Sequence, residues 1–175
     1  MGKQIAMLGA SGMAFALMAA PALADNHASE EEEVVITNEM IFPADAVWKH
    51  SFDAYEGQAG EVNAALRRAL AFSKAMEEQG VAPERVKIGI VVHGPSVFDV
   101  SDHARYGEKY YGLENPNTEV VAELIERGAE IWVCGFAAKY HKVGNVHLLD
   151  GVKMAPTGTV AHAELQRRGY GINAY

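Results

Sequence analysis

Short apolar runs alternate with amphipathic segments along most of the chain. The apolar runs are bounded by glycine, proline or polar residues, which is typical of strands buried on both faces of a sheet. The segments between them repeat apolar residues every three or four positions, as amphipathic helices do. We therefore predict strands over residues 47–53, 86–93, 130–134, 152–155 and 171–174. The predicted helices cover residues 61–79, 116–127, 136–142 and 158–168.

Local residues mark where these helices begin and end. Asn115 can cap a helix through its side-chain oxygen, and Pro116 suits the first helical position because its missing N–H would be unpaired there. Thr157 can cap the last helix, and Gly80 and Gly128 can adopt the left-handed conformation at helix ends. Strands that alternate with helices predict a single α/β domain. We expect a three-layer α/β/α sandwich, flavodoxin-like or Rossmann-like, with a parallel sheet of about five strands.

Residues 1–24 have the pattern of a signal peptide. Lys3 is their only charged residue, and an uncharged apolar run ends at the small-x-small site Ala22-Leu23-Ala24. We expect cleavage before Asp25 and, in a Gram-negative source, a periplasmic location; an uncleaved anchor is the alternative, although the run is short for one. Residues 25–45 form an acidic lead-in that we expect to be poorly ordered, in which 34–37 could add an edge strand. The α/β domain then covers residues 46–175.

The charge of the chain excludes several classes of partner. The formal net charge is −8, and it becomes −9 when Lys3 is removed with the signal peptide. Such a chain lacks the basic surface that binds nucleic acid or anionic lipid, so we expect neither partner. No Gly-x-Gly-x-x-Gly, Walker or Gly-x-Ser-x-Gly motif follows a predicted strand, and we predict no cofactor. No Cys-x-x-Cys or His-Glu-x-x-His spacing occurs, so no metal site is predicted either.

The only cysteine is the strongest candidate for chemistry. Cys134 ends the predicted strand 130–134 and is followed by Gly135 and a predicted helix, whose N-terminus favours a thiolate, as a nearby cation such as Lys139 would. His93 ends another predicted strand in the same way, and an imidazole beside a thiol can activate it. The alternatives are a small buried cysteine and a histidine that only bonds the backbone at a strand end.

The segment 94–114 is longer than most connections between a strand and a helix. It leaves from His93, contains Tyr106 and Tyr110, and is expected to be partly helical over 101–111. It could fold over the thiol, in which case Tyr106 and Tyr110 would line a pocket. A contact between subunits is equally compatible with its tyrosines. The predicted pocket residues are Gly94, Gly135, Tyr106, Tyr110 and Lys139.

Several stretches together resemble one family. They are Val91-Val92-His93-Gly94-Pro95, Asn115-Pro116-Asn117, the run 128–135 that contains Cys134, Gly151-Val152, and the run 163–170. Over about 47–175 the chain resembles the DsrE/DsrF-like family, specifically its exported single-domain members. The resemblance implies a five-stranded parallel sheet and a homo-oligomer, often a trimer or hexamer. It also implies that Cys134 carries sulfur as a persulfide.

The predicted function is therefore a periplasmic sulfur carrier or sulfurtransferase-like protein that uses Cys134 and His93. Its partners would be a sulfur donor or acceptor protein, or a small sulfur compound. The signal peptide and the tyrosine-rich segment 94–114 depart from the cytoplasmic members of the family. One alternative is an oligomeric protein that binds a small ligand or metal in a pocket near Cys134 and His93. An oligomeric scaffold without chemistry is a second.

Overall fold

The computed structural model describes residues 35–43 and 45–173. The expected signal peptide, the lead-in residues 25–34 and the last residue of the predicted strand 171–174 lie outside these ranges. Residues 35–39 form no strand, so the edge strand considered for 34–37 is not formed in its described part. Among the described residues, none of the helices has the length and hydrophobicity needed to span a membrane.

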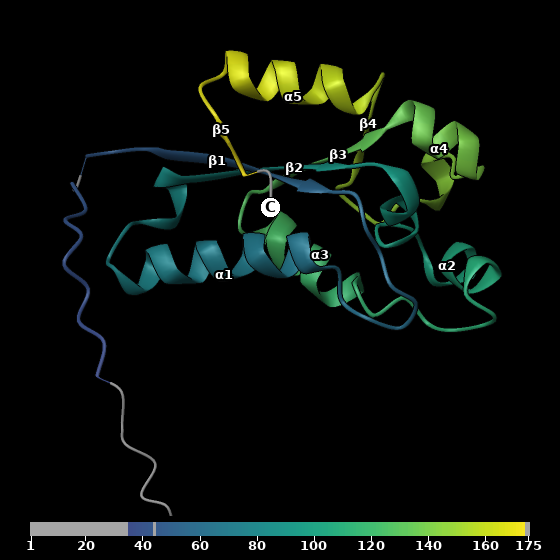
Figure 1. Cartoon of the computed structure of the whole chain (residues 1–175), viewed down its shortest axis with the longest axis horizontal. Coiled ribbons are helices and arrows are strands. Elements are labelled where there is room, and N and C mark those ends of the chain that lie inside the picture. The colour runs from purple at the N-terminus through teal and green to yellow at the C-terminus, as the bar shows by residue number, and fades with distance from the viewer. Residues whose placement is uncertain (1–34, 44, 174–175) are drawn as a thin grey trace, which may run out of the picture. The chain divides into compact units, whose positions relative to one another are not determined.

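Five parallel strands form one sheet, as predicted. The strands are β1 (Trp48–Ala54), β2 (Val86–Val92), β3 (Glu130–Cys134), β4 (Lys153–Ala155) and β5 (Gly171–Asn173). Their order across the sheet is β4-β3-β2-β1-β5 (Figure 1). Val92 pairs with both Ala54 and Val133, so the carboxyl ends of the three central strands lie along one edge. In parallel α/β sheets this is the edge where functional side chains gather.

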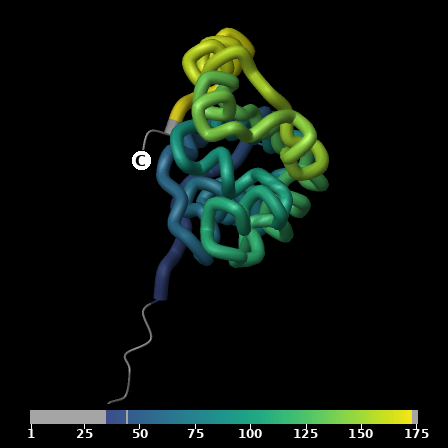
Figure 2. Tube along the Cα trace, turned by 90° about the vertical axis from the view of Figure 1, so that its right-hand side faces the viewer, coloured from purple at the N-terminus to yellow at the C-terminus, as the bar shows by residue number. Residues whose placement is uncertain are grey.

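Two layers of helices cover the sheet unequally. The α-helices are α1 (Ala64–Glu78), α2 (His103–Lys109), α3 (Thr118–Glu126), α4 (Gly135–His141) and α5 (Gly158–Arg167). Short 3₁₀ helices are η1 (Pro83–Arg85), η2 (Gly94–Phe98) and η3 (Asn145–His147). Figures 1 and 2 show α1 and α3 on one face and α5 alone on the other. Right-handed crossovers explain this arrangement. The connections from β1 to β4 all move across the sheet in one direction, so their helices lie on one face. The connection from β4 to β5 moves in the opposite direction, so its helix, α5, lies on the other face.

Alternate strand residues face these two layers and form two cores. The larger core lies under α1 and α3, and the smaller one lies under α5. The buried members of the smaller core are Val91, Ala155, Ala161, Leu165 and Tyr170. A Cβ atom at Gly89 would lie 2.8 Å from both methyl groups of Leu165. The missing side chain of Gly89 therefore lets α5 pack close to the sheet.

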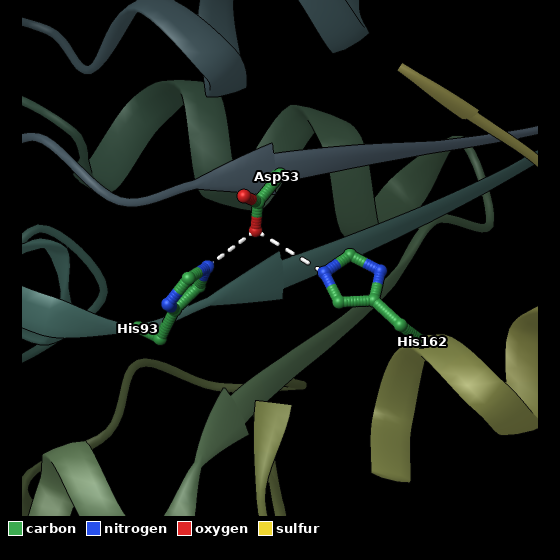
Figure 3. A group of neighbouring side chains, drawn as sticks. All are labelled: Asp53, His93 and His162. Atoms are coloured by element: carbon green, nitrogen blue, oxygen red, sulfur yellow. Dashed lines mark hydrogen bonds and ion pairs between the residues drawn. The ribbon is translucent and has the colours of Figure 1, made fainter. Parts of the chain in front are cut away.

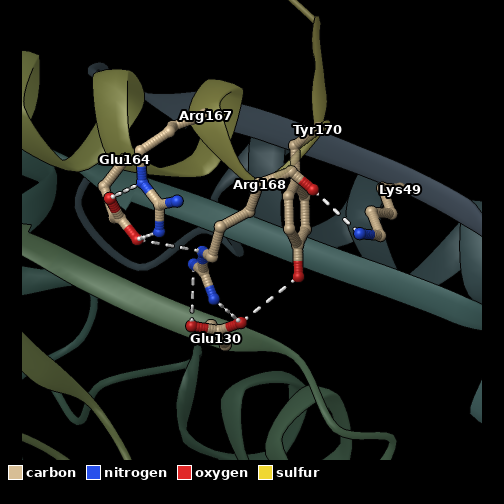
Figure 4. A network of polar contacts seen from close by, with 6 residues as sticks. All are labelled: Lys49, Glu130, Glu164, Arg167, Arg168 and Tyr170. Carbon is tan, nitrogen blue, oxygen red and sulfur yellow. Dashed lines mark hydrogen bonds and ion pairs between the residues drawn. The ribbon is translucent and has the colours of Figure 1, made fainter.

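A polar network holds the C-terminal end of α5 to the start of β3 (Figure 4). Arg168 donates two hydrogen bonds to the carboxylate of Glu130, at 2.8 and 3.0 Å, and the hydroxyl of Tyr170 donates a third at 3.2 Å. Lys49 donates to the backbone carbonyl of Arg168 at 2.8 Å. Partial burial acts to raise the pKa of Glu130, but the hydrogen bonds and charge of Arg168 outweigh it and lower that pKa. A paired arginine and carboxylate of this kind fixes orientation as well as position.

The predicted start of the second long helix is corrected by the structure. The helix α3 begins at Thr118, two residues later than predicted, and Asn117 is its N-cap residue without a side-chain hydrogen bond. The amide of Asn115 instead donates to the backbone carbonyls of Asp99 and Ser101, at 3.0 and 2.7 Å. Its oxygen accepts from the backbone N–H of Asn117 at 2.9 Å. Asn115 therefore secures the chain after η2, because buried carbonyls there need a donor.

Candidate functional site

Side chains that could act in catalysis or binding gather where β1, β2 and β3 end, on the face covered by α5. Val91 and Trp132 belong to the core under α5 and are partners in the register of β2 and β3. Asp53 pairs with Val91 and therefore shares this face. His93 and Cys134 each follow a member of this pair by two positions, so they continue along the same face. The structure thus brings the two predicted catalytic residues to neighbouring strand ends.

Cys134 is half-buried and lies between two helix N-termini. It is the N-cap residue of α4, as predicted from its place before a helix. A Cβ atom at Gly158, the first residue of α5, would lie 3.8 Å from the Cys134 sulfur. A Cβ atom at Gly135 would lie 2.7 Å from the carbonyl oxygen of Ala155. Glycine is therefore needed at position 135 for the chain to turn from β3 into α4 beside β4.

His93 belongs to a group of three side chains from three elements. Its Nε2 lies 2.5 Å from Oδ1 of Asp53, at the end of β1. The Nε2 of His162, on α5, lies 3.2 Å from the same oxygen. Figure 3 shows the carboxylate between the two imidazole rings. The second ring nitrogen of His162, Nδ1, is buried and has no hydrogen-bond partner in the described part of the chain.

The backbone after β2 supports this arrangement. Gly94 has a φ of +58°, which glycine adopts without strain. A Cβ atom there would lie 2.8 Å from the ring of Tyr55. That ring packs against the imidazole of His93, with centroids 5.1 Å apart. Gly94 therefore lets the chain turn sharply while Tyr55 stays against His93.

This group was not predicted from the sequence, because its members lie far apart in the chain. Asp53 and His93 are 40 positions apart, and Asp53 and His162 are 109 apart. The one usable signal was that Asp53 ends the predicted strand 47–53, as His93 ends its own strand. The ligand atoms of the three side chains lie within 4.8 Å of one another, so they could hold a metal ion.

Tyr106 and Tyr110 belong to the core under α1 and α3, whereas Cys134 lies against α5. The segment 94–114 folds into η2 and α2, and the helical part predicted for it is present. Tyr106 is fully buried in the core under α1 and α3, and its hydroxyl accepts a hydrogen bond from the N–H of Gly60 at 2.8 Å. The ring of Tyr110 packs on that of Tyr106, with centroids 4.6 Å apart. Tyr106 has no exposed surface with which to line a pocket. Lys139, which was also predicted to line the pocket, is exposed on α4.

An open pocket of about 430 Å³ adjoins the group of three. It lies between the end of β1 and the start of α1. Its lining residues are Asp53, Tyr55, Glu56, Asn63, Ala64, Ala65 and Arg68. Cys134 is not among them, while Asp53 belongs both to this pocket and to the group with the two histidines. Asp53 is therefore the residue that the pocket and the group of three have in common.

A buried carboxyl group lies behind this pocket. Asp99, which follows η2, is 1% exposed. The side-chain amide of Asn63 donates to Oδ2 of Asp99 at 2.8 Å and to the hydroxyl oxygen of Ser96 at 3.1 Å. Burial raises the pKa of Asp99 to about 6, although hydrogen bonds from Asn63 and Ser96 act to lower it. This network ties η2 to the N-terminus of α1, which Asn63 caps.

Comparison with known proteins gives a family match and two similar solved structures. The model of the DsrE/DsrF-like family matches residues 57–173. Among solved structures, the chain is similar to a protein of unknown function, MTH1491 from Methanobacterium thermoautotrophicum, with a TM-score of 0.51 and 17% identity over 72% of this chain and 97% of that one. It is also similar to the ychN protein of E. coli, with a TM-score of 0.49 and 15% identity over the same shares.

The similarity to MTH1491, at 17% identity, shows a common fold only. No curated protein sequence matches the chain. The family model is more informative, because its match runs from the loop before α1 to β5 and so includes His93, Cys134 and His162. The fold and this match agree with the resemblance found in the sequence, and the chain belongs to the DsrE/DsrF-like family.

Proposed function

We propose that the protein is a periplasmic sulfur carrier, or a sulfurtransferase-like protein, that holds a sulfane sulfur on Cys134 as a persulfide. Membership of the DsrE/DsrF-like family supports a role related to sulfur metabolism. The observation that carries the proposal is the position of Cys134. Its thiol is half-buried at the end of β3 and lies against the first residue of α5. A helix N-terminus favours an anion, and the thiolate is the nucleophilic form of cysteine.

The proposed reaction needs no oxidant. The Cys134 thiolate attacks the outer sulfur of a donor persulfide, a sulfur–sulfur bond forms on Cys134, and the donor leaves as its thiolate. An acceptor thiolate then attacks the outer sulfur and releases Cys134. Because the chain has one cysteine, no internal disulfide can discharge the persulfide. The acceptor must therefore be a second molecule.

His93 is the second residue in the proposal. It follows β2 beside Cys134 in the strand order, and its hydrogen bond to Asp53 orients its ring. An imidazole held in this way can take the proton of a neighbouring thiol. Replacing His93 should therefore slow sulfur uptake without preventing it, because polysulfide also reacts with the fraction of thiolate present at neutral pH.

The test is to incubate the reduced protein with polysulfide and to weigh the intact chain by mass spectrometry. Wild type should gain mass in multiples of one sulfur atom, Cys134→Ser should gain none, and His93→Gln should gain it more slowly. His103→Gln, on the exposed start of α2, is the matched control and should behave as wild type. The proposal fails if wild type gains no sulfur. If iodoacetamide also leaves the native protein unlabelled near neutral pH, Cys134 is only a packing residue.

A further inference from the structure

We propose that Asp53, His93 and His162 bind a divalent transition-metal ion, for which Zn²⁺ is the representative. Each side chain offers one ligand atom, and these atoms lie within 4.8 Å of one another. The three residues come from β1, the residue after β2, and α5, so the fold itself assembles the set. This inference does not depend on a sulfur-carrier role for Cys134.

The geometry is close to what a metal site needs. The Nε2 atoms of His93 and His162 lie 2.5 and 3.2 Å from Oδ1 of Asp53. Zinc binds imidazole nitrogen and carboxylate oxygen at about 2.0–2.2 Å, which places tetrahedral ligands roughly 3.3 Å apart. A small rotation of the Asp53 carboxylate away from His93 would therefore make room for the ion between the three atoms.

The ligand types fit a catalytic rather than a structural site. Two imidazoles and one carboxylate bind Zn²⁺ in hydrolytic enzymes and Fe²⁺ in non-haem oxygenases, and in both cases they leave coordination positions open. The side chains of Asp53, His93 and His162 are 34%, 28% and 21% exposed, so an ion can reach them from solvent. The open pocket that Asp53 also lines gives an exogenous ligand space beside the ion.

The surrounding structure holds the ligands in place before any ion arrives. The ring of Tyr55 packs on His93. The helix that carries His162 is fixed at one end by the bond between Arg168 and Glu130, and along its length by Leu165 against Gly89. Ligands on rigid strands and packed helices lose little freedom when they bind. A preformed set of ligands therefore binds an ion more tightly than a flexible cluster of surface side chains does.

A bound ion would also change the role of His93. Its Nε2 would be a metal ligand, so the imidazole would no longer serve as the base for Cys134. The positive charge of the ion would lie on the same face and edge of the sheet as the thiol. A nearby metal ion favours the thiolate. Activation of Cys134 would then come from the ion rather than from the imidazole.

The experiment is a calorimetric titration of untagged, chelator-treated protein with Zn²⁺. Wild type should bind one ion per chain. His162→Ala and Asp53→Asn should each weaken binding by at least about 100-fold, since loss of a supporting residue alone can cost 10- to 100-fold. His147→Ala, at the last residue of η3, and Cys134→Ser should bind as wild type. With Co²⁺, the absorption spectrum should show the weak visible bands of a nitrogen and oxygen site, without an intense near-ultraviolet sulfur-to-metal band, in both wild type and Cys134→Ser.

Three results would overturn the metal site. Wild type that binds no ion in this titration would mean that Asp53 only joins the two histidines by hydrogen bonds. Unchanged binding by His162→Ala would place the ion elsewhere. An intense sulfur-to-cobalt band that disappears in Cys134→Ser would replace the proposed ligands by a thiolate site. If circular dichroism shows that His162→Ala is not folded, His162→Gln answers the same question with a side chain of similar volume.

His162→Ala should still take up sulfur from polysulfide, which separates this inference from the proposed function.

Discussion

Replacing Asp99 with asparagine should remove a pH dependence of the free energy of unfolding that the wild type has. The carboxyl group of Asp99 is buried. Its Oδ2 accepts a hydrogen bond from the amide of Asn63, and its Oδ1 has no hydrogen-bond partner in the described part of the chain. Burial raises its pKa from 3.8 to about 6. The folded protein therefore holds this proton to a higher pH than the unfolded chain does.

The sign and size of the effect follow from proton binding. Between about pH 4 and pH 6 the folded protein binds more protons than the unfolded chain, so Asp99 lowers the free energy of unfolding as the pH rises. The difference between pKa values of 3.8 and about 6 corresponds to roughly 3 kcal/mol in total. About 2 kcal/mol of this is lost between pH 4.5 and pH 7.5. Asparagine has nearly the same shape and cannot ionise.

Urea denaturation of wild type and Asp99→Asn at pH 4.5 and pH 7.5 measures this difference. The free energy of unfolding of the variant, relative to wild type, should rise by about 2 kcal/mol from the lower to the higher pH. Asp45→Asn removes an exposed carboxylate and is the matched control, for which the same difference should stay within about 0.5 kcal/mol. An equally small change for Asp99→Asn would show that Asp99 does not titrate with a raised pKa.

Two further predictions concern α5 and self-association. Arg168→Met should lower the free energy of unfolding by about 1–3 kcal/mol at neutral pH. The loss should shrink as the pH falls through the lowered pKa of Glu130, since protonation removes the ion pair. Arg167→Met, which breaks an exposed pair, should lower the free energy of unfolding by less than Arg168→Met does, and equal losses in the two urea titrations would refute the role of the network. Phe136 and Tyr140 are 72% and 81% exposed on α4, so we expect a homo-oligomer that buries them. Light scattering should show dissociation in Phe136→Glu but not in Tyr111→Glu, and a monomeric wild type would contradict the prediction.

The sequence predicted the fold well because strand and helix signals are local. It also predicted that Cys134 ends a strand and that His93 ends another. The second strand, β2, ends one residue earlier, at Val92, and the register places the two strands side by side. Strand order is not a local property, however, and it decides that α5 covers one face alone. His162 reaches Asp53 only because of that order.

The tyrosines of segment 94–114 show a second limit. An aromatic residue in a long connection can cover a site, join subunits or fill a core, and its own neighbours in the sequence do not distinguish these roles. Tyr106 fills the core because the N–H of Gly60 satisfies its hydroxyl there, 46 positions away in the chain. Tyr111, five residues after Tyr106, is fully exposed.

The position of α5 and β5 at the end of the chain bears on how the site comes into being during synthesis. A chain made from its N-terminus has β1 to β4 available before the helix that carries His162 emerges. Until α5 docks, Val91 and Trp132 have no helix over them, and the thiol of Cys134 lies on an uncovered sheet. A chain that stops before Gly158 would keep Asp53, His93 and Cys134 but could never complete the group of three. Completion of this site therefore reports that the whole domain has been made and folded.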